Sequence, residues 1–387
     1  MTALYRTIQV FTLLFFMIVL SACAAKSRIY EAPSQKKYTL AAIPGYHNIR
    51  YWGDRTSGKV DETIERLKAN KSIHQRVDVL ALSGGAEDGA YGAGFLKGWS
   101  ERGNRPEFTL VTGISTGALI APFAFLGPKY DDVIKRLYTE TSRNKIFLLT
   151  PFTVLFGGSA VADTAPLRKI LREEIDAAFV AKLAKESRKG RILHIGTTNL
   201  DAQRPVVWDI TRIAQSGRDD APGLIRNIML ASASIPGAFP PVLIDVNIDG
   251  KRYQELHVDG GVTRQIFVYP NDLNVRRFQR KLHIHPQKTF WLIRNTKIAP
   301  EYSAVSLSVS DIAERSFNTL IKYQGRGDLY NIEALSRRDG FDLYITNVPS
   351  DFRMVPKEMF DREYMNILYR IGYNKARSNG AWKRKIN

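Results

Sequence analysis

The sequence predicts an α/β fold, because from about residue 75 onward short apolar runs alternate with segments of helical pattern. A sheet whose strands are joined by crossover helices produces this alternation. The runs that we predict as strands are residues 77–82, 108–112, 192–197, 206–209, 289–294 and 341–348. The clearest helical pattern lies near the end of the chain, where one face of a 3.6-residue repeat carries Phe360, Tyr364, Ile367, Leu368 and Ile371.

Composition indicates a globular protein with an anionic partner. Of 387 residues, 44% are apolar and 24% are charged, which is typical of folded domains. The 56 Lys and Arg exceed the 38 Asp and Glu, which gives a formal charge of +18. A surplus of this size favours contact with nucleic acid or with a phospholipid surface, and charge alone does not decide between them.

The first residues predict export and a lipid anchor. Arg6 precedes an apolar run over residues 10–20, which is shorter than the roughly 20 residues that span a bilayer and is typical of a signal peptide. The run ends in Leu20-Ser21-Ala22-Cys23, which resembles the lipobox of bacterial lipoproteins, so we expect Cys23 to be acylated. The alternative is a signal peptide cleaved elsewhere, with Cys23 incidental. Cys23 is the only cysteine, so an internal disulfide is excluded.

These features predict four segments and a location. Residues 1–22 are the signal peptide, 23–40 a polar tether, 41–378 one folded domain, and 379–387 a solvated basic tail. The residue after Cys23 is Ala24 rather than Asp, which, by resemblance to enterobacterial lipoproteins, favours the periplasmic face of the outer membrane. An exported protein does not meet nucleic acid, so the basic surplus favours an anionic membrane surface.

A candidate nucleophile lies in Gly113-Ile114-Ser115-Thr116-Gly117, which matches the G-x-S-x-G motif. The motif follows a predicted strand and precedes a helical stretch over residues 118–125. A sharp turn from strand to helix crowds the backbone around the serine, so glycines are needed on both sides of Ser115. An ordinary tight turn is the alternative interpretation.

A second motif is the glycine-rich segment over residues 82–94, which follows the predicted strand 77–82. Such a loop presents backbone N–H groups that bind either a phosphate or an oxyanion. No G-K-[ST] follows and no regular G-x-G-x-x-G is present, so the pattern argues against a nucleotide site. The position of the loop ahead of Ser115 favours an oxyanion hole.

The third motif is His257-Val258-Asp259-Gly260-Gly261, after an apparent strand over residues 252–258. An aspartate followed by two glycines has little side-chain bulk beyond it, so a serine can approach its carboxylate. A turn between two strands is the alternative interpretation.

In this order, the three motifs resemble those of the patatin-like phospholipases, and the resemblance covers roughly residues 75–265. It implies a three-layer α/β fold, with helices on both faces of a central, mostly parallel sheet. It also implies hydrolysis of acyl esters of membrane lipids, such as phospholipids, without a metal or other cofactor. Carried over position by position, Ser115 is the nucleophile, Asp259 is the base, and the oxyanion hole consists of the amides of Gly84, Gly85 and Ala86.

The glycine loop departs from the family pattern of three glycines, a small residue, arginine and glycine. Ala86 replaces the third glycine, and Glu87 and Asp88 replace the small residue and the arginine. This departure supports an alternative function, a catalytically weak lipoprotein that binds lipid or a partner protein. A third hypothesis is a Ser-His-Asp hydrolase, for which His257, His283 and His285 are the candidate histidines.

We expect Cys23→Ser to abolish acylation of the protein, because a hydroxyl cannot form the thioether. Metabolic labelling with a palmitate analogue measures this directly. A label that persists in the variant would show that Cys23 is not the anchor.

Overall fold

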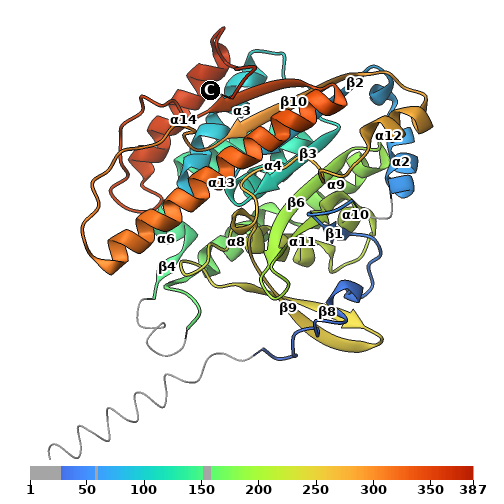
Figure 1. The fold of residues 1–387 in the computed structure, drawn as a ribbon, viewed down its shortest axis with the longest axis horizontal. Helices are drawn as coiled ribbons and strands as arrows, with labels where there is room; N and C mark the ends of the chain where they lie inside the picture. The colour runs from blue at the N-terminus through green and yellow to red at the C-terminus, as the bar shows by residue number, and fades with distance from the viewer. Residues whose placement is uncertain (1–27, 57–59, 151–157, 387) are drawn as a thin grey trace, which may run out of the picture.

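The computed structural model describes residues 28–56, 60–150 and 158–386 (Figure 1). The predicted signal peptide and Cys23 lie outside these ranges. The strands of the large sheet are β1 (Arg50–Trp52), β2 (Arg76–Leu82), β3 (Leu110–Ile114), β6 (Ile192–Asn199), β7 (Arg204–Asp209), β8 (Val242–Ile248), β9 (Lys251–Asp259), β10 (Gln287–Arg294) and β11 (Asp342–Asn347). A small second sheet consists of β4 (Leu148–Leu149) and β5 (Ala162–Asp163).

The large sheet is mixed, and its central strands are parallel. The strand order is β1-β7-β6-β3-β2-β10-β11, and β9 pairs with both β6 and β8. The pairs that join β6, β3, β2, β10 and β11 are parallel, whereas β7 and β9 run antiparallel to their neighbours. Each of the six predicted strands overlaps a strand of this sheet, and the predicted α/β fold is confirmed.

The helices cover both faces of the sheet. They are α2 (Val60–Lys68), α3 (Gly89–Glu101), α4 (Thr116–Leu126), α5 (Asp131–Thr139), α6 (Arg143–Ile146), α8 (Ala165–Glu174), α9 (Ala177–Arg188), α10 (Ile210–Gln215), α11 (Ala221–Ser232), α12 (Val275–Leu282), α13 (Val309–Asp339) and α14 (Arg362–Arg377). Within the described ranges, no helix combines the length and the hydropathy that are needed to cross a membrane.

The alternation of side chains along β2 divides the interior into two cores. Leu80 and Leu82 point into the larger core, which is covered by helices that include α3, α4, α11 and α14. Val79 and Ala81 point into the smaller core, where the C-terminal half of α13 packs. Figure 1 shows α13 crossing one face of the sheet. A strand that is buried on both faces reads as a continuous apolar run, which explains why the sequence revealed it.

Helices α3 and α14 pack with their backbones in close contact, and glycines make this approach possible. A Cβ on Gly94 of α3 would collide with the Tyr369 carbonyl oxygen of α14. Conversely, a Cβ on Gly372 of α14 would collide with the Tyr91 carbonyl oxygen of α3. Because α3 begins directly after the glycine-rich loop, this pair of helices fixes the position of the loop.

The packed chain extends beyond the predicted domain limits at both ends. In the segment predicted as a tether, Arg28 forms an ion pair with Asp201, and Gln254 of β9 donates its N–H to the Glu31 carbonyl oxygen at 3.0 Å. The predicted basic tail is also packed, since Ala381 and Ile386 are buried. The boundaries at residues 41 and 378 are therefore corrected to include these segments.

The C-terminal segment adds a short bridge to the edge of the sheet. Lys383 and Ile345 of β11 exchange two backbone hydrogen bonds of 2.8 Å each. The Trp382 ring lies 4.8 Å from the Trp99 ring and 5.0 Å from the Trp291 ring, measured between ring centroids. The prediction of a solvated tail is based on the basic residues 383–385, whereas the packing of the segment depends on Trp382.

We expect Gly94→Ala to destabilise the protein by about 1–3 kcal/mol, because the added methyl group forces α3 and α14 apart. Gly327→Ala is the matched control, since Gly327 also lies inside a helix but no atom would contact the added Cβ. That control should gain up to about 1 kcal/mol from helix propensity. Chemical denaturation of both variants checks this. Equal stabilities would contradict the role of the glycine contact.

Candidate active site

Ser115 lies at a sharp turn between β3 and α4, as the G-x-S-x-G motif predicts. Its φ of 54° and ψ of −126° belong to a region that non-glycine residues rarely adopt. A Cβ on Gly113 would lie 2.8 Å from Ala118 Cα, and one on Gly117 would collide with the Leu82 carbonyl oxygen. Close backbone approach therefore requires both flanking glycines.

Hydrogen bonds from neighbouring elements hold the strained turn. The Ser115 N–H donates to Ser232 Oγ at 3.0 Å, and the Ser232 hydroxyl donates to the Gly196 carbonyl oxygen at 2.6 Å. Ser232 ends α11, and Gly196 belongs to β6, which pairs with β3. These groups are buried, so water does not replace the hydrogen bonds that fix the serine.

Asp259 ends β9, at the same end of the sheet as Ser115. Its register partner is Thr197 of β6, the strand next to β3. A Cβ on Gly260 would lie 2.8 Å from Ile114 Cδ1, so the glycine after the aspartate allows the turn to pack against the serine strand. The structure thus brings Ser115 and Asp259 together, as the motifs predict.

The Asp259 carboxyl group has the properties of a base that works near neutral pH. Burial raises its pKa to about 7, although the Ser115 hydroxyl and the Gly261 N–H lower it. Oδ1 accepts the Gly261 N–H at 2.6 Å, and Oδ2 has no hydrogen-bond partner within the described part of the chain. The Ser115 interaction is therefore longer or less well aligned than a normal hydrogen bond, as is common before substrate binds.

The glycine-rich loop after β2 passes beside Ser115. A Cβ on Gly84 would lie 3.8 Å from Ser115 Oγ, and Gly85 has a φ of 148° that favours glycine. The Gly84 N–H donates to the Gln265 carbonyl oxygen at 3.1 Å, so it is not available to an oxyanion, which corrects the prediction for Gly84. Within the described ranges, the N–H groups of Gly85 and Ala86 donate no hydrogen bond.

Burial affects the acidity of both acidic residues of the loop. Burial raises the pKa of Glu87, and it raises the pKa of Asp88 to about 7. The Tyr364 hydroxyl of α14 donates to Asp88 Oδ1 at 2.6 Å, which lowers that pKa in part. A large fraction of Asp88 is therefore protonated near neutral pH.

Sequence analysis missed a buried cation beside this loop. Arg294 ends β10, the strand next to β2, and its surface is 2% exposed. Burial lowers its pKa to about 10, whereas the charges of Asp328 and Asp88 raise it. Its Nη1 is buried and has no hydrogen-bond partner among the described residues. The available signal was a single arginine at the end of an otherwise apolar strand.

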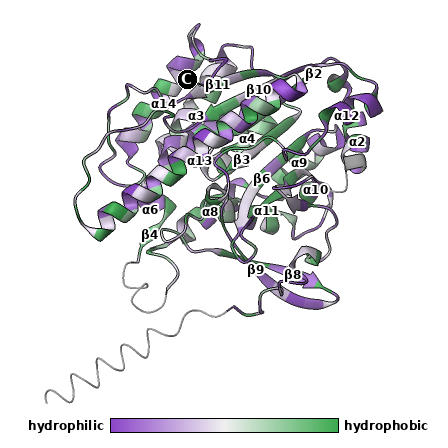
Figure 2. Cartoon of the chain, viewed as in Figure 1, coloured by the Kyte–Doolittle hydropathy of each residue, from purple (hydrophilic) through white to green (hydrophobic). Residues whose placement is uncertain are grey.

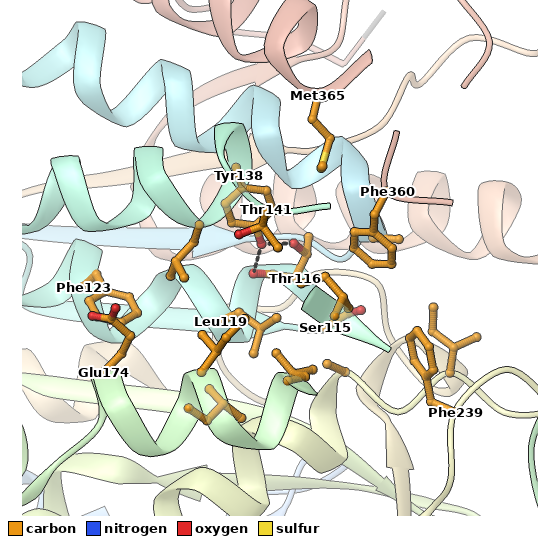
Figure 3. A pocket seen from close by; sticks show the side chains of 18 residues that line it. Ser115, Thr116, Leu119, Phe123, Tyr138, Thr141, Glu174, Phe239, Phe360 and Met365 are labelled. Atoms are coloured by element: carbon orange, nitrogen blue, oxygen red, sulfur yellow. Dashed lines mark hydrogen bonds between the residues drawn. The ribbon is translucent and has the colours of Figure 1, made fainter. Parts of the chain in front are cut away.

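A cavity of about 60 Å³ opens beside Ser115 (Figure 3). In Figure 3, Thr116 and Tyr138 are joined by a hydrogen bond next to Ser115. The remaining wall is mainly apolar and includes Leu119, Phe123, Leu137, Leu167, Leu171, Ile235, Phe239, Phe360 and Met365. A mainly apolar cavity that reaches a serine hydroxyl suits the hydrocarbon part of an acyl ester.

A larger cavity, of about 210 Å³, lies at the opposite ends of the parallel strands. Val77 of β2, Leu110 of β3 and Ile192 of β6 line it, and neither Ser115 nor Asp259 does. The candidate active site is therefore assigned from its reactive groups and not from cavity size.

The histidines considered from the sequence lie away from Ser115. The ring nitrogens of buried His257 face Thr197 Oγ1 at 2.9 Å and Glu255 Oε2 at 3.1 Å, and burial lowers the pKa of the ring. His283 and His285 are exposed and precede β10, whose other end lies beside the glycine loop. This arrangement leaves Asp259 as the proton acceptor nearest to Ser115.

Comparisons with known proteins bear on the family of the chain. No curated protein matches the chain at a significant level. Among solved structures, the chain is similar to the crystal structure of VipD from Legionella pneumophila, with 13% identity and a TM-score of 0.36, over 92% of this chain and 72% of that chain. Residues 80–270 match the family model described as "Patatin-like phospholipase". Residues 80–270 therefore correspond to a patatin-like phospholipase domain.

Proposed function

We propose that the protein is a serine acyl hydrolase that cleaves fatty-acyl esters of phospholipids or lysophospholipids. The family match supports a lipase- or esterase-type hydrolase at the level of the family. The observation that carries the finer proposal is the juxtaposition of a strained serine with a buried carboxyl group whose pKa is about 7. The apolar cavity beside Ser115 supports a fatty-acyl substrate.

In the proposed reaction, Asp259 accepts the hydroxyl proton as Ser115 Oγ attacks the ester carbonyl carbon. The tetrahedral intermediate collapses, the bond to the alcohol breaks, and Asp259 returns the proton to the leaving oxygen. A water molecule then attacks the acyl-enzyme while Asp259 takes a proton from it. Fatty acid leaves, and Ser115 regains its proton.

The oxyanion that forms in both steps needs fixed donors. The amides of Gly85 and Ala86 suit this role, because they point to no acceptor in the described chain and Ala86 lines the cavity with Ser115. The N-terminus of α4 adds positive potential at the same place. Arg294 supplies a buried positive charge beside the loop, which offsets the acidic residues there.

We further propose that acylated Cys23 holds the enzyme at the periplasmic face of the outer membrane. This location rests on the sequence before residue 28 and would place the enzyme on its lipid substrate. A second candidate function is a catalytically weak lipoprotein that binds lipid or a partner protein. Glu87 and Asp88 favour it, because they stand where the family pattern has a small residue and an arginine, so the loop itself lacks that cation beside the oxyanion hole.

We expect Ser115→Ala and Asp259→Asn each to reduce hydrolysis of a soluble ester on the order of 10³-fold or more. The double variant should be little worse than either single one, because the two residues act as one unit. The measurement is kcat/KM, together with covalent labelling of Ser115 by a fluorophosphonate probe.

Asp249→Asn is the matched control for these variants, because Asp249 is exposed in the turn between β8 and β9. It should keep the parental rate. Retained activity in Asp259→Asn together with its loss in His257→Ala would contradict the dyad. An unlabelled, inactive parent protein would favour the lipid-binding candidate.

We expect kcat/KM to rise with pH through about 7, because Asp259 accepts a proton only when it is ionised and burial raises its pKa to about 7. Asp88 titrates in the same range, so the profile must also be measured in Asp88→Asn. The rise should persist in that variant. A rise that disappears with Asp88 would assign the titration to the loop instead.

A further inference from the structure

The N-terminal half of α13 projects from the body of the protein and contains no buried residue. The first buried residue of this helix is Gly325, although the helix begins at Val309. Figure 1 shows this end of α13 extending past the sheet that its other half covers. We call the segment from Tyr302 to Gln324 the projecting segment.

The projecting segment exposes large apolar side chains. Tyr302 is 98% exposed, Leu307 97%, Val309 87% and Leu320 69%. Figure 2 shows hydrophobic residues at this end of α13. The other exposed apolar members of the segment are Val305, Ile312, Phe317 and Tyr323. Soluble proteins rarely expose a contiguous set of this kind without a partner.

The helical part of this set forms one stripe. Val309, Ile312, Leu320 and Tyr323 recur at the spacing that places them on a single side of a helix. An isolated helix of this length is only marginally stable in water, because helix stability in proteins comes mainly from burial of such a stripe. A surface that covers the stripe would therefore stabilise the helix.

The charges beside the stripe favour an anionic lipid surface over a second copy of the chain. Arg315, which also donates to the Glu301 carbonyl oxygen, and Arg326 lie on one flank of the stripe. The acidic residues Asp311 and Glu314 lie on the side of the helix opposite the stripe. The Arg326 guanidinium lies 5.3 Å from the centroid of the Tyr323 ring. A second copy would bring together two chains of formal charge +18, whereas anionic headgroups attract both arginines.

Helix α13 also contacts the turn that follows Asp259. Gln324 Nε2 donates to the Val262 carbonyl oxygen at 3.1 Å, and Gln265 Nε2 donates to Gln324 Oε1 at 3.3 Å. Val262 lies three residues after Asp259, and the Gln265 carbonyl oxygen holds the Gly84 amide. Hydrogen bonds therefore connect the end of the projecting segment to the turn that follows Asp259.

We infer that the projecting segment is an interfacial docking element that lays the active site on an anionic phospholipid bilayer. The apolar stripe enters the boundary between headgroups and acyl chains. Arg315 of the segment and Arg326, two residues beyond its end, contact the phosphates. This inference rests on the proposed function, the hydrolysis of lipid esters. Its first test compares two substrates, and its second test does not depend on catalysis.

The first test uses the full chain carrying Leu307→Asp and Leu320→Asp. The rate on phosphatidylglycerol vesicles should fall about tenfold or more, because two apolar contacts with the bilayer are replaced by negative charges. The rate on the soluble ester p-nitrophenyl butyrate should not change. The matched control, Leu40→Asp with Leu243→Asp, alters two exposed leucines outside the projecting segment and should keep both rates.

An unchanged vesicle rate in the first variant would overturn the inference. An equal fall on both substrates would also overturn it, because the effect would then be structural. A parent that hydrolyses neither substrate would instead refute the proposed function, and the second test would still decide the docking.

The second test places an environment-sensitive fluorophore on Leu320→Cys in a full chain that also carries Cys23→Ser, which leaves one thiol. Phosphatidylglycerol vesicles should shift the emission to the blue, and phosphatidylcholine vesicles should do so much less. The same label on Leu243→Cys should not respond. Equal responses at both positions, or a lipid-independent dimer that Leu320→Asp dissociates, would contradict docking on lipid.

Discussion

The site depends on one constraint, the close approach of four backbone segments around Ser115. The end of β2, the turn between β3 and α4, β6 and the turn after β9 meet so closely that Gly113, Gly117 and Gly260 have no room for a Cβ. The strain at Ser115 persists because the Ser115 N–H donates to Ser232 Oγ, and the Ser232 hydroxyl in turn donates to the Gly196 carbonyl oxygen. The orientation of Ser115, the position of Asp259 and the path of the glycine loop all follow from this packing.

Burial away from water shifts the pKa values of the charged groups around Ser115. Asp259 and Asp88 both have pKa values raised to about 7 by burial, and Arg294 has one lowered to about 10. The two carboxyl groups are therefore partly neutral near pH 7, which limits the cost of burying them, whereas Arg294 keeps its positive charge. Asp259 differs from Asp88 in its partner, since a serine lies beside the first and a tyrosine donates to the second.

The sequence predicted those parts of the fold that depend on local pattern. The apolar runs marked the central strands because these are buried on both faces, and short motifs identified Ser115 and Asp259. Contacts between distant segments were not predictable in this way. The Gly84 N–H, which was expected in the oxyanion hole, donates instead to the Gln265 carbonyl oxygen. Arg294 reaches the loop from a strand about 200 residues further along the chain. Helix α13 was missed because the apolar residues of its first half face outward.

The packing of the C-terminal segment has a consequence for how the chain avoids misassembly. Strand β11 is the last strand of the sheet path, and an open strand edge is a template for pairing with another chain. The bridge from Lys383 to Ile345 occupies part of that edge, and Trp382 fastens the bridge to the aromatic cluster beneath it. Residues 382 and 383 thus protect this edge of the sheet from pairing with another chain. A fusion or truncation that displaced Trp382 and Lys383 would expose the edge of β11 and favour aggregation. The turn that holds Ser115 would stay unchanged.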